Sequence, residues 1–173
     1  MEFKFETIYN QEAVTVMAKA LRKTTRKKKS RRLHLVGPII VIFAILLTFP
    51  LGDKEFILDF RTVVTWFVSV ILLLALIFED KINGYVARKR MLPGLDKSVV
   101  TFSEEGYLSE TPVGKTEFKY DNIVMLAETT AYFVFIFSQN HAQVYDKQTL
   151  SGGTEEEFRK FIQNVTGKGI QRV

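Results

Sequence analysis

Residues 33–51 read LHLVGPIIVIFAILLTFPL and residues 62–78 read TVVTWFVSVILLLALIF, and these two apolar stretches decide the fold. Neither contains Asp, Glu, Lys or Arg. A bilayer core of roughly 30 Å is crossed by about 20 apolar helical residues, with about 17 as the lower end. Because only the short segment 52–61 separates the stretches, and unpaired backbone groups are costly in lipid, we predict a transmembrane hairpin with an outer loop. The long N-terminal arm favours an uncleaved anchor over a signal peptide.

The net charge of +5 is concentrated beside the apolar stretches. The basic side chains that flank them are Arg26, Lys27, Lys28, Lys29, Arg31 and Arg32 on one side and Arg88, Lys89 and Arg90 on the other. Lys and Arg near a span favour the cytoplasmic side. We therefore predict a multi-pass protein of the cell membrane with both termini cytoplasmic. Its expected partner is the lipid bilayer and not nucleic acid, because no aromatic residues interleave with the basic run 24–32.

Small and hydroxylated residues recur along one side of each apolar stretch. Ala44 and Thr48 lie four residues apart in the first stretch, and Thr62, Thr65 and Ser69 share a helical face in the second. Such residues let helix backbones approach closely in lipid. We expect these faces to meet within the hairpin, with a homodimer contact through the same face as the alternative.

The regions outside the hairpin have their own patterns. Residues 1–32 predict a strand over 2–8, a helix capped by Asn10 and then the basic run, while residues 79–96 predict a juxtamembrane helix and linker. Residues 97–173 predict several short strands, of which the nearly apolar stretch 131–138 is expected to be buried on both faces. Thr154 and Glu157 form a capping-box pattern that predicts a C-terminal helix. The predicted fold class is thus α+β: a transmembrane hairpin plus a small antiparallel sheet closed by a C-terminal helix.

Four segments carry a family resemblance: VTFSEEGYLSE, FKYDNIVMLAETTAYFVFIF, YDKQTL and EEEFRKFI. They resemble the C-terminal domain of YcxB-like membrane proteins, and the layout of a basic stretch and two spans is similar as well. The resemblance implies a cytoplasmic, pleckstrin-homology-like (PH-like) domain over residues 97–173. Tyr120 and Asp121 stand where the family has an aromatic residue and an Asp before an Ile, and Lys147 keeps the lysine of a proline-lysine pair. The resemblance implies these three residues as candidates for partner binding.

Catalytic equipment is sparse in this sequence. His34 and His141 are the two histidines and lie in different regions, there is no cysteine, and no glycine-rich loop is followed by a phosphate-binding lysine. We therefore predict no enzyme activity, no metal and no cofactor. The predicted function is a membrane-anchored binding module whose cytoplasmic PH-like domain docks a protein or lipid partner. The alternative is an immunity protein whose hairpin neutralises a membrane-active toxin or bacteriocin.

Overall fold

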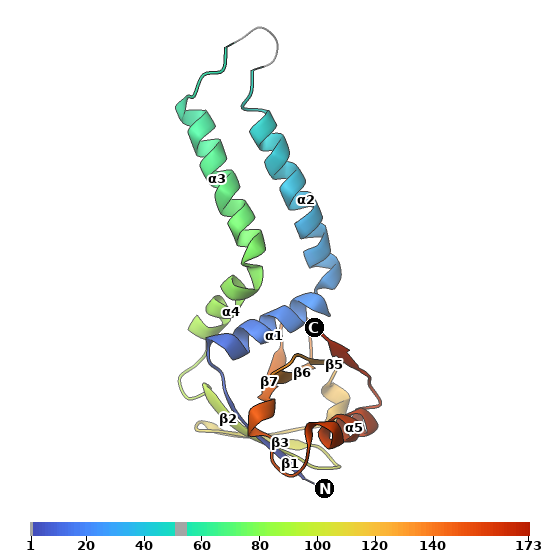
Figure 1. Cartoon of the computed structure of the whole chain (residues 1–173). Coiled ribbons are helices and arrows are strands. Elements are labelled where there is room, and N and C mark those ends of the chain that lie inside the picture. The colour runs from blue at the N-terminus through green and yellow to red at the C-terminus, as the bar shows by residue number, and fades with distance from the viewer. Residues whose placement is uncertain (1, 51–54) are drawn as a thin grey trace.

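The computed structural model describes residues 2–50 and 55–173, and it shows a pair of long helices standing on a domain of two small sheets (Figure 1). Residues 51–54, which include the start of the predicted outer loop, lie outside the described residues. The elements in chain order are β1 Phe3–Ile8, α1 Gln11–Lys23, α2 Lys27–Leu46, α3 Phe60–Ile77, α4 Glu79–Lys89, β2 Lys97–Phe102, β3 Tyr107–Thr111, β4 Gly114–Phe118, η1 Tyr120–Asn122, β5 Met125–Glu128, β6 Tyr132–Ile136, β7 Ala142–Asp146, η2 Lys147–Thr149, α5 Glu155–Thr166 and β8 Ile170–Arg172.

The first sheet joins the N-terminal strand to the segment after the helices. Its order is β1-β2-β3-β4, with all neighbours antiparallel. In β1 alternate residues are buried, so Phe3 and Phe5 point inward opposite Phe102 and Val100 of β2. Sequence analysis assigns β1 and β2 to separate regions, whereas the structure places them side by side in one sheet.

The second sheet has the order β7-β6-β5-β8. Its last strand, β8, runs parallel to β5, with Leu126 opposite Ile170. The prediction of one antiparallel sheet therefore needs correction: the described residues form two sheets, and one of them holds a parallel pair. The physical reason is that α5 carries the chain back across the domain, which is how a parallel neighbour is reached.

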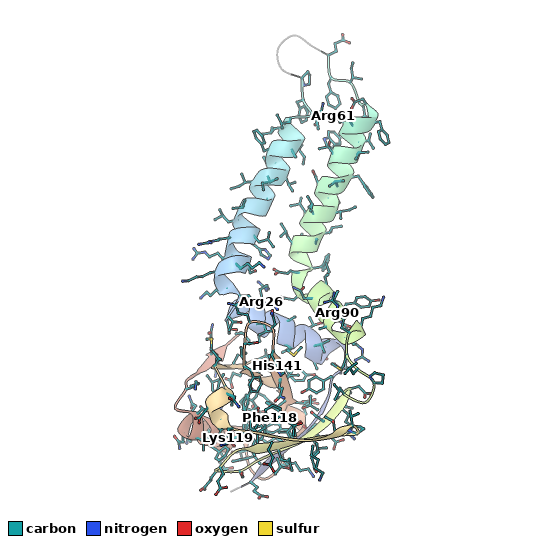
Figure 2. All side chains as sticks on the ribbon, turned by 180° about the vertical axis from the view of Figure 1, so that it is seen from behind. Arg26, Arg61, Arg90, Phe118, Lys119 and His141 are labelled. Carbon is teal, nitrogen blue, oxygen red and sulfur yellow. The ribbon has the colours of Figure 1, made fainter. Side chains whose placement is uncertain are left out.

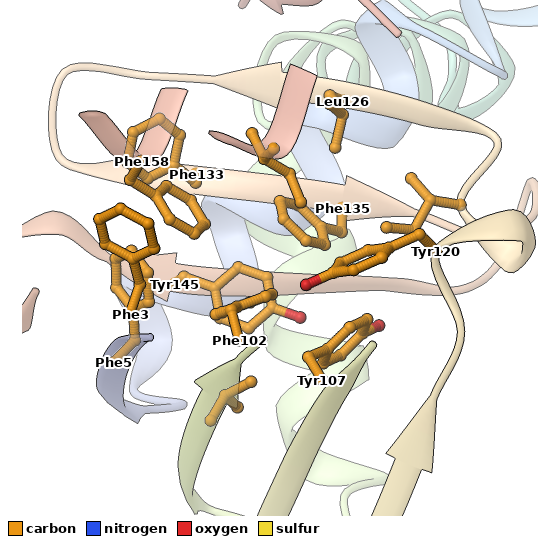
Figure 3. Packing of buried hydrophobic residues seen from close by; sticks show 13 residues of the cluster. Phe3, Phe5, Phe102, Tyr107, Tyr120, Leu126, Phe133, Phe135, Tyr145 and Phe158 are labelled. Atoms are coloured by element: carbon orange, nitrogen blue, oxygen red, sulfur yellow. The ribbon is translucent and has the colours of Figure 1, made fainter. Parts of the chain in front are cut away.

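An aromatic core fills the space between the two sheets, and α5 closes it (Figure 3). Phe158 of α5 lies with its ring centroid 4.7 Å from that of Phe5 and 5.0 Å from that of Phe133, both in edge-to-face packing. The predicted capping box is present, because the Thr154 and Glu157 side chains each accept from the other's backbone amide. It fixes the start of α5 and so directs Phe158 and Ile162 into the core.

Helix α1 covers the outer face of the second sheet. Ala13, Ala20 and Leu21 of α1 pack in one cluster with Val134 and Val144 of the sheet. As a result every residue of β6 is buried, as predicted for the apolar stretch 131–138. Asn10 caps α1 as expected, its side chain accepting from the Ala13 amide 2.8 Å away.

The long helices agree only in part with the predicted spans. α3 is, among the described residues, the one helix long and apolar enough to cross a membrane, with a mean hydropathy of 2.3. α2 includes the basic residues 27–32 at its start and ends at Leu46, so its apolar part is shorter than the predicted stretch 33–51. Pro50 and the preceding turn explain the early end. α4 begins after Phe78, whose backbone departs from helical values, and it packs against α1 instead of continuing α3.

Candidate functional site

The contact between α2 and α3 includes several of the small and hydroxylated residues singled out in the sequence. Thr62 and Ser69 of α3 are buried, and Ala44, Thr48 and Thr65 are half-buried. The Trp66 Nε1 donates to Thr48 Oγ1 at 3.1 Å, which ties the far ends of the helices together. At the near end, a Cβ on Gly37 would lie 2.8 Å from the Leu76 side chain, so the two helices approach closely there and a larger residue would require the Leu76 side chain to shift. Part of this face thus lies in the contact between α2 and α3 of the same chain.

Beyond the basic start of α2, the remaining surface of the helix pair is largely apolar. Large side chains stand exposed around both helices, among them Leu35, Ile39, Ile40, Ile42, Phe43 and Leu46 of α2 and Phe67, Val70, Ile71, Leu72, Leu74 and Ile77 of α3. An exposed apolar surface that continues around two neighbouring helices exceeds what water-facing proteins tolerate. This surface therefore needs an apolar partner along most of its length.

Polar contacts hold the helices to the domain at a junction that we call the neck, formed by the ends of α1, α2, α3 and α4. Arg22 of α1 binds Asp80 of α4 with two hydrogen bonds of 2.6 and 2.7 Å. Ser30 donates to Glu79 Oε2 at 3.1 Å, and His34 Nε2 lies 2.7 Å from the same oxygen. Gly84 permits the close approach of α4 to α1, since a Cβ there would lie 2.8 Å from Thr15 Cα. The neck is therefore held by polar contacts between α1 and α4 and between α2 and α4.

The predicted orienting cations divide into two groups. Arg26 donates to Gln139 O at 2.7 Å and to Asn140 Oδ1 at 2.6 Å, while Arg88 donates to Tyr9 O at 2.6 Å. The other group forms no ion pair or side-chain hydrogen bond with the described residues; its members are Lys27, Lys28, Lys29, Arg31, Arg32, Lys89 and Arg90. Figure 2 shows Arg26 and Arg90 at the domain end of the helix pair and Arg61 at its far end. The unpaired cations thus gather at one end of the apolar surface.

A second charged cluster lies on the domain, around Glu128 at the end of β5. The Glu128 side chain is only 6% exposed, with Arg159 Nε at 3.1 Å, Arg172 Nε at 3.2 Å and Lys147 Nζ at 3.7 Å from its oxygens. Burial raises the pKa of Glu128, but the Arg159 hydrogen bond and the charge of Lys147 outweigh this effect and lower it overall. A cavity of about 360 Å³ opens beside these groups. Because Lys147 and Arg159 also pair with Glu155, the cations are already neutralised.

The three residues implied for partner binding do not form one site. Tyr120 is buried, and its hydroxyl donates to Ser103 O at 2.6 Å, so it fastens the β2–β3 turn; burial also raises its pKa. Asp121 is exposed, and neither it nor Tyr120 lines the cavity next to Lys147. Sequence reasoning missed Glu128 and Arg159. The available signal was a lone carboxylate at the end of an otherwise apolar strand, which demands a basic partner.

A groove lies on the outer face of the first sheet. This sheet is at the end of the domain away from the helix pair (Figure 1). The groove has a volume of about 650 Å³, and Thr101, Leu108 and Glu117 form a row across its floor because they are register partners in β2, β3 and β4. Glu2, Glu105 and Lys119 also line it, which leaves the groove acidic on balance. Within residues 2–50 and 55–173 no cluster of three or more His, Cys, Asp or Glu is suited to hold a metal ion.

The chain is therefore an α+β protein in which a two-sheet domain carries a pair of apolar helices. Residues 102–162, from the end of β2 into α5, match the family model described as YcxB-like protein, so this part of the chain is YcxB-like. This match confirms the resemblance expected from the sequence over those residues. A comparison with curated proteins finds no match.

Proposed function

We propose that this chain is a membrane-anchored, non-enzymatic binding module. In this proposal α2 and α3 cross the bilayer as a hairpin, and the sheet domain, which the YcxB-like resemblance suggests is PH-like, docks a protein partner at the inner face of the cell membrane. The exposed apolar surface of both helices supports membrane insertion. The 18 residues of α3 extend about 27 Å, close to the thickness of a bilayer core.

The pairing of β1 with β2 is the observation that carries the hairpin proposal. These strands precede and follow the helix pair, and their register runs from Phe3 opposite Phe102 to Ile8 opposite Lys97. If α3 crossed a membrane alone, β1 and β2 would be on opposite sides and this sheet could not form. A crossing by α3 therefore requires a return crossing by α2. The shorter apolar part of α2 is compatible with this role, because Arg31 and Arg32 can extend toward the headgroups and the bilayer can thin locally.

The charge distribution supports an inward-facing domain. The unpaired cations gather at the domain end of the helices, whereas the far end has Arg61 with Glu55 and Asp59 close in sequence. Basic residues are retained on the cytoplasmic side. Both termini are then cytoplasmic in this proposal.

The acidic groove of the first sheet is the docking surface in this proposal. The groove lies on the outer face of the first sheet, and this sheet is at the end of the domain away from the helices (Figure 1), where a cytoplasmic protein would have free access. Its balance of charge suits a partner with a basic surface. The Glu128 cluster is less suited, because its cations are already paired within the chain.

Fluorescence quenching tests the membrane insertion without any mutation. Trp66 is the single tryptophan of the chain and lies in α3. In vesicles, lipids brominated along the acyl chain should quench its emission, while aqueous iodide should have little effect. Quenching by iodide alone would overturn the proposal.

Site-directed cross-linking tests the docking surface, and the absence of cysteine from the chain makes single labels simple. In native membranes, a photo-crosslinker on Leu108→Cys should capture a defined partner. The matched control is Val113→Cys, which is exposed in the β3–β4 turn outside the groove. Equal products from the two positions would contradict docking in the groove.

A further inference from the structure

One side of α2 presents cations and then aliphatic side chains along a single line. Lys28, Arg31, Arg32, Leu35 and Val36 line a groove of about 260 Å³. Their spacing of three and four residues places them on one exposed face of the helix. The line passes from charge to hydrocarbon within about 12 Å, which is the rise of eight helical residues.

The three cations of this groove have no anionic partner within the described part of the chain. Lys28, Arg31 and Arg32 form no ion pair there, in contrast to Arg22, which binds Asp80, and Arg26, which binds the 139–140 turn. Leu35 and Val36 are 60% and 47% exposed, although both are apolar. The groove thus combines unpaired positive charges with an exposed hydrocarbon surface.

We propose that this groove binds one anionic phospholipid of the inner leaflet. Its phosphate lies against Lys28, Arg31 and Arg32, and the start of an acyl chain lies along Leu35 and Val36. Arginine suits this role because its planar guanidinium binds phosphate oxygens with two parallel hydrogen bonds. A soluble phosphate would contact the cations alone, whereas a phospholipid also places an acyl chain along Leu35 and Val36, so the amphiphile accounts for both halves of the groove. The proposal rests on the membrane insertion of α2 described above.

Native mass spectrometry of the detergent-purified full chain tests this site. The probe is phosphatidylglycerol, compared with phosphatidylcholine that has the same acyl chains. The wild-type chain should retain one molecule of phosphatidylglycerol in preference to phosphatidylcholine. Each basic side chain near the headgroup should contribute about fivefold to the affinity. The variant K28Q/R31Q/R32Q, which lacks three of them, should therefore bind phosphatidylglycerol more weakly by on the order of 100-fold.

The matched control is K29Q/K89Q/R90Q, which removes the same number of charges from exposed residues that do not line the groove. This control should bind within a few-fold of the wild type. Equal losses in the two variants, or equal retention of both lipids by the wild type, would overturn the proposal. Competition by glycerol phosphate as strong as that by the lipid would also overturn it, because the acyl contact would then contribute nothing.

The Trp66 quenching experiment keeps the two proposals apart. If Trp66 is quenched by brominated lipids but no selective adduct forms, the lipid site is wrong and the membrane anchor stands. If Trp66 is not quenched, the anchor itself fails.

Discussion

Replacing Glu128 by Gln should destabilise the sheet domain far more than replacing Glu156 by Gln. Both changes remove one negative charge, and both carboxylates contact Arg159, at 3.1 Å and 2.6 Å respectively. Glu128 is 6% exposed, whereas Glu156 is 66% exposed and its pair is screened by water. The two variants therefore separate the effect of burial from the effect of charge.

The expected magnitude follows from what Glu128 holds in place. Without its charge, Lys147, whose side chain is 7% exposed, keeps Glu155 alone as an anionic partner, at 3.3 Å. Removing one partner of a buried ion pair costs about 3–5 kcal/mol. The side-chain oxygen of a Gln in this position can still accept one hydrogen bond, worth about 1 kcal/mol. We thus expect a loss of roughly 2–4 kcal/mol for Glu128→Gln and at most about 1 kcal/mol for Glu156→Gln.

The pH dependence gives an independent check. The folded-state pKa of Glu128 lies below the value of about 4.3 for an unfolded Glu. Its ionised form therefore stabilises the domain above about pH 4.3, and this contribution is lost as the pH falls through the folded pKa. Glu128→Gln should lose less stability on acidification than the wild type does.

Thermal unfolding of the detergent-purified full chain, followed by near-ultraviolet circular dichroism of the core tyrosines, measures both effects. At about 4–8 °C per kcal/mol, Glu128→Gln should lower the Tm by on the order of 10 °C or more. Equal shifts in the two variants, or acid sensitivity in Glu128→Gln identical to that of the wild type, would refute this reasoning.

Three further changes probe the core, the neck and the helix contact. Phe158→Ala should cost about 3–5 kcal/mol in the same unfolding assay, because its fully buried ring joins both sheets. Gly84→Ala should destabilise the neck, where the new Cβ meets Thr15, while Gly114→Ala, which meets nothing within 4 Å, should be tolerated; limited proteolysis between α4 and β2 would report the difference. Ser69→Leu should weaken the α2–α3 contact in an SDS titration, whereas Val70→Leu on the exposed side should leave it unchanged.

Local sequence signals predicted most elements of the domain but not how they assemble. The buried strand within residues 131–138 and the capping box at Thr154 follow from composition and spacing within a few residues. The pairing of β1 with β2 joins segments that are separated by the whole helix pair, and no local period contains that information. The short strand β8 carries too few residues for any pattern, and its position depends on the return path of α5.

The candidate site likewise combines features that follow from local sequence with features that depend on how the elements assemble. The position of Thr62 and Ser69 on one helical face follows directly from their spacing, and both are buried. The Glu128 cluster could not be predicted, since Lys147, Arg159 and Arg172 come from three elements that meet only after the sheets and α5 have packed. Tertiary contacts also decide which basic residues are paired. Arg26 binds Asn140, whereas Arg31 and Arg32 of the same run are exposed.

The two connections between helices and domain fix the direction in which the docking groove faces. α1 lies on the second sheet and leads into α2, while α3 leads through α4 into β2 of the first sheet. The Arg22–Asp80 and Arg88–Tyr9 contacts tie these two connections to each other. A domain on a flexible linker would sweep a volume below the membrane, but this one is held at both sheets. In the proposed function, a partner must therefore approach from the cytoplasm onto a surface presented at a set distance from the bilayer.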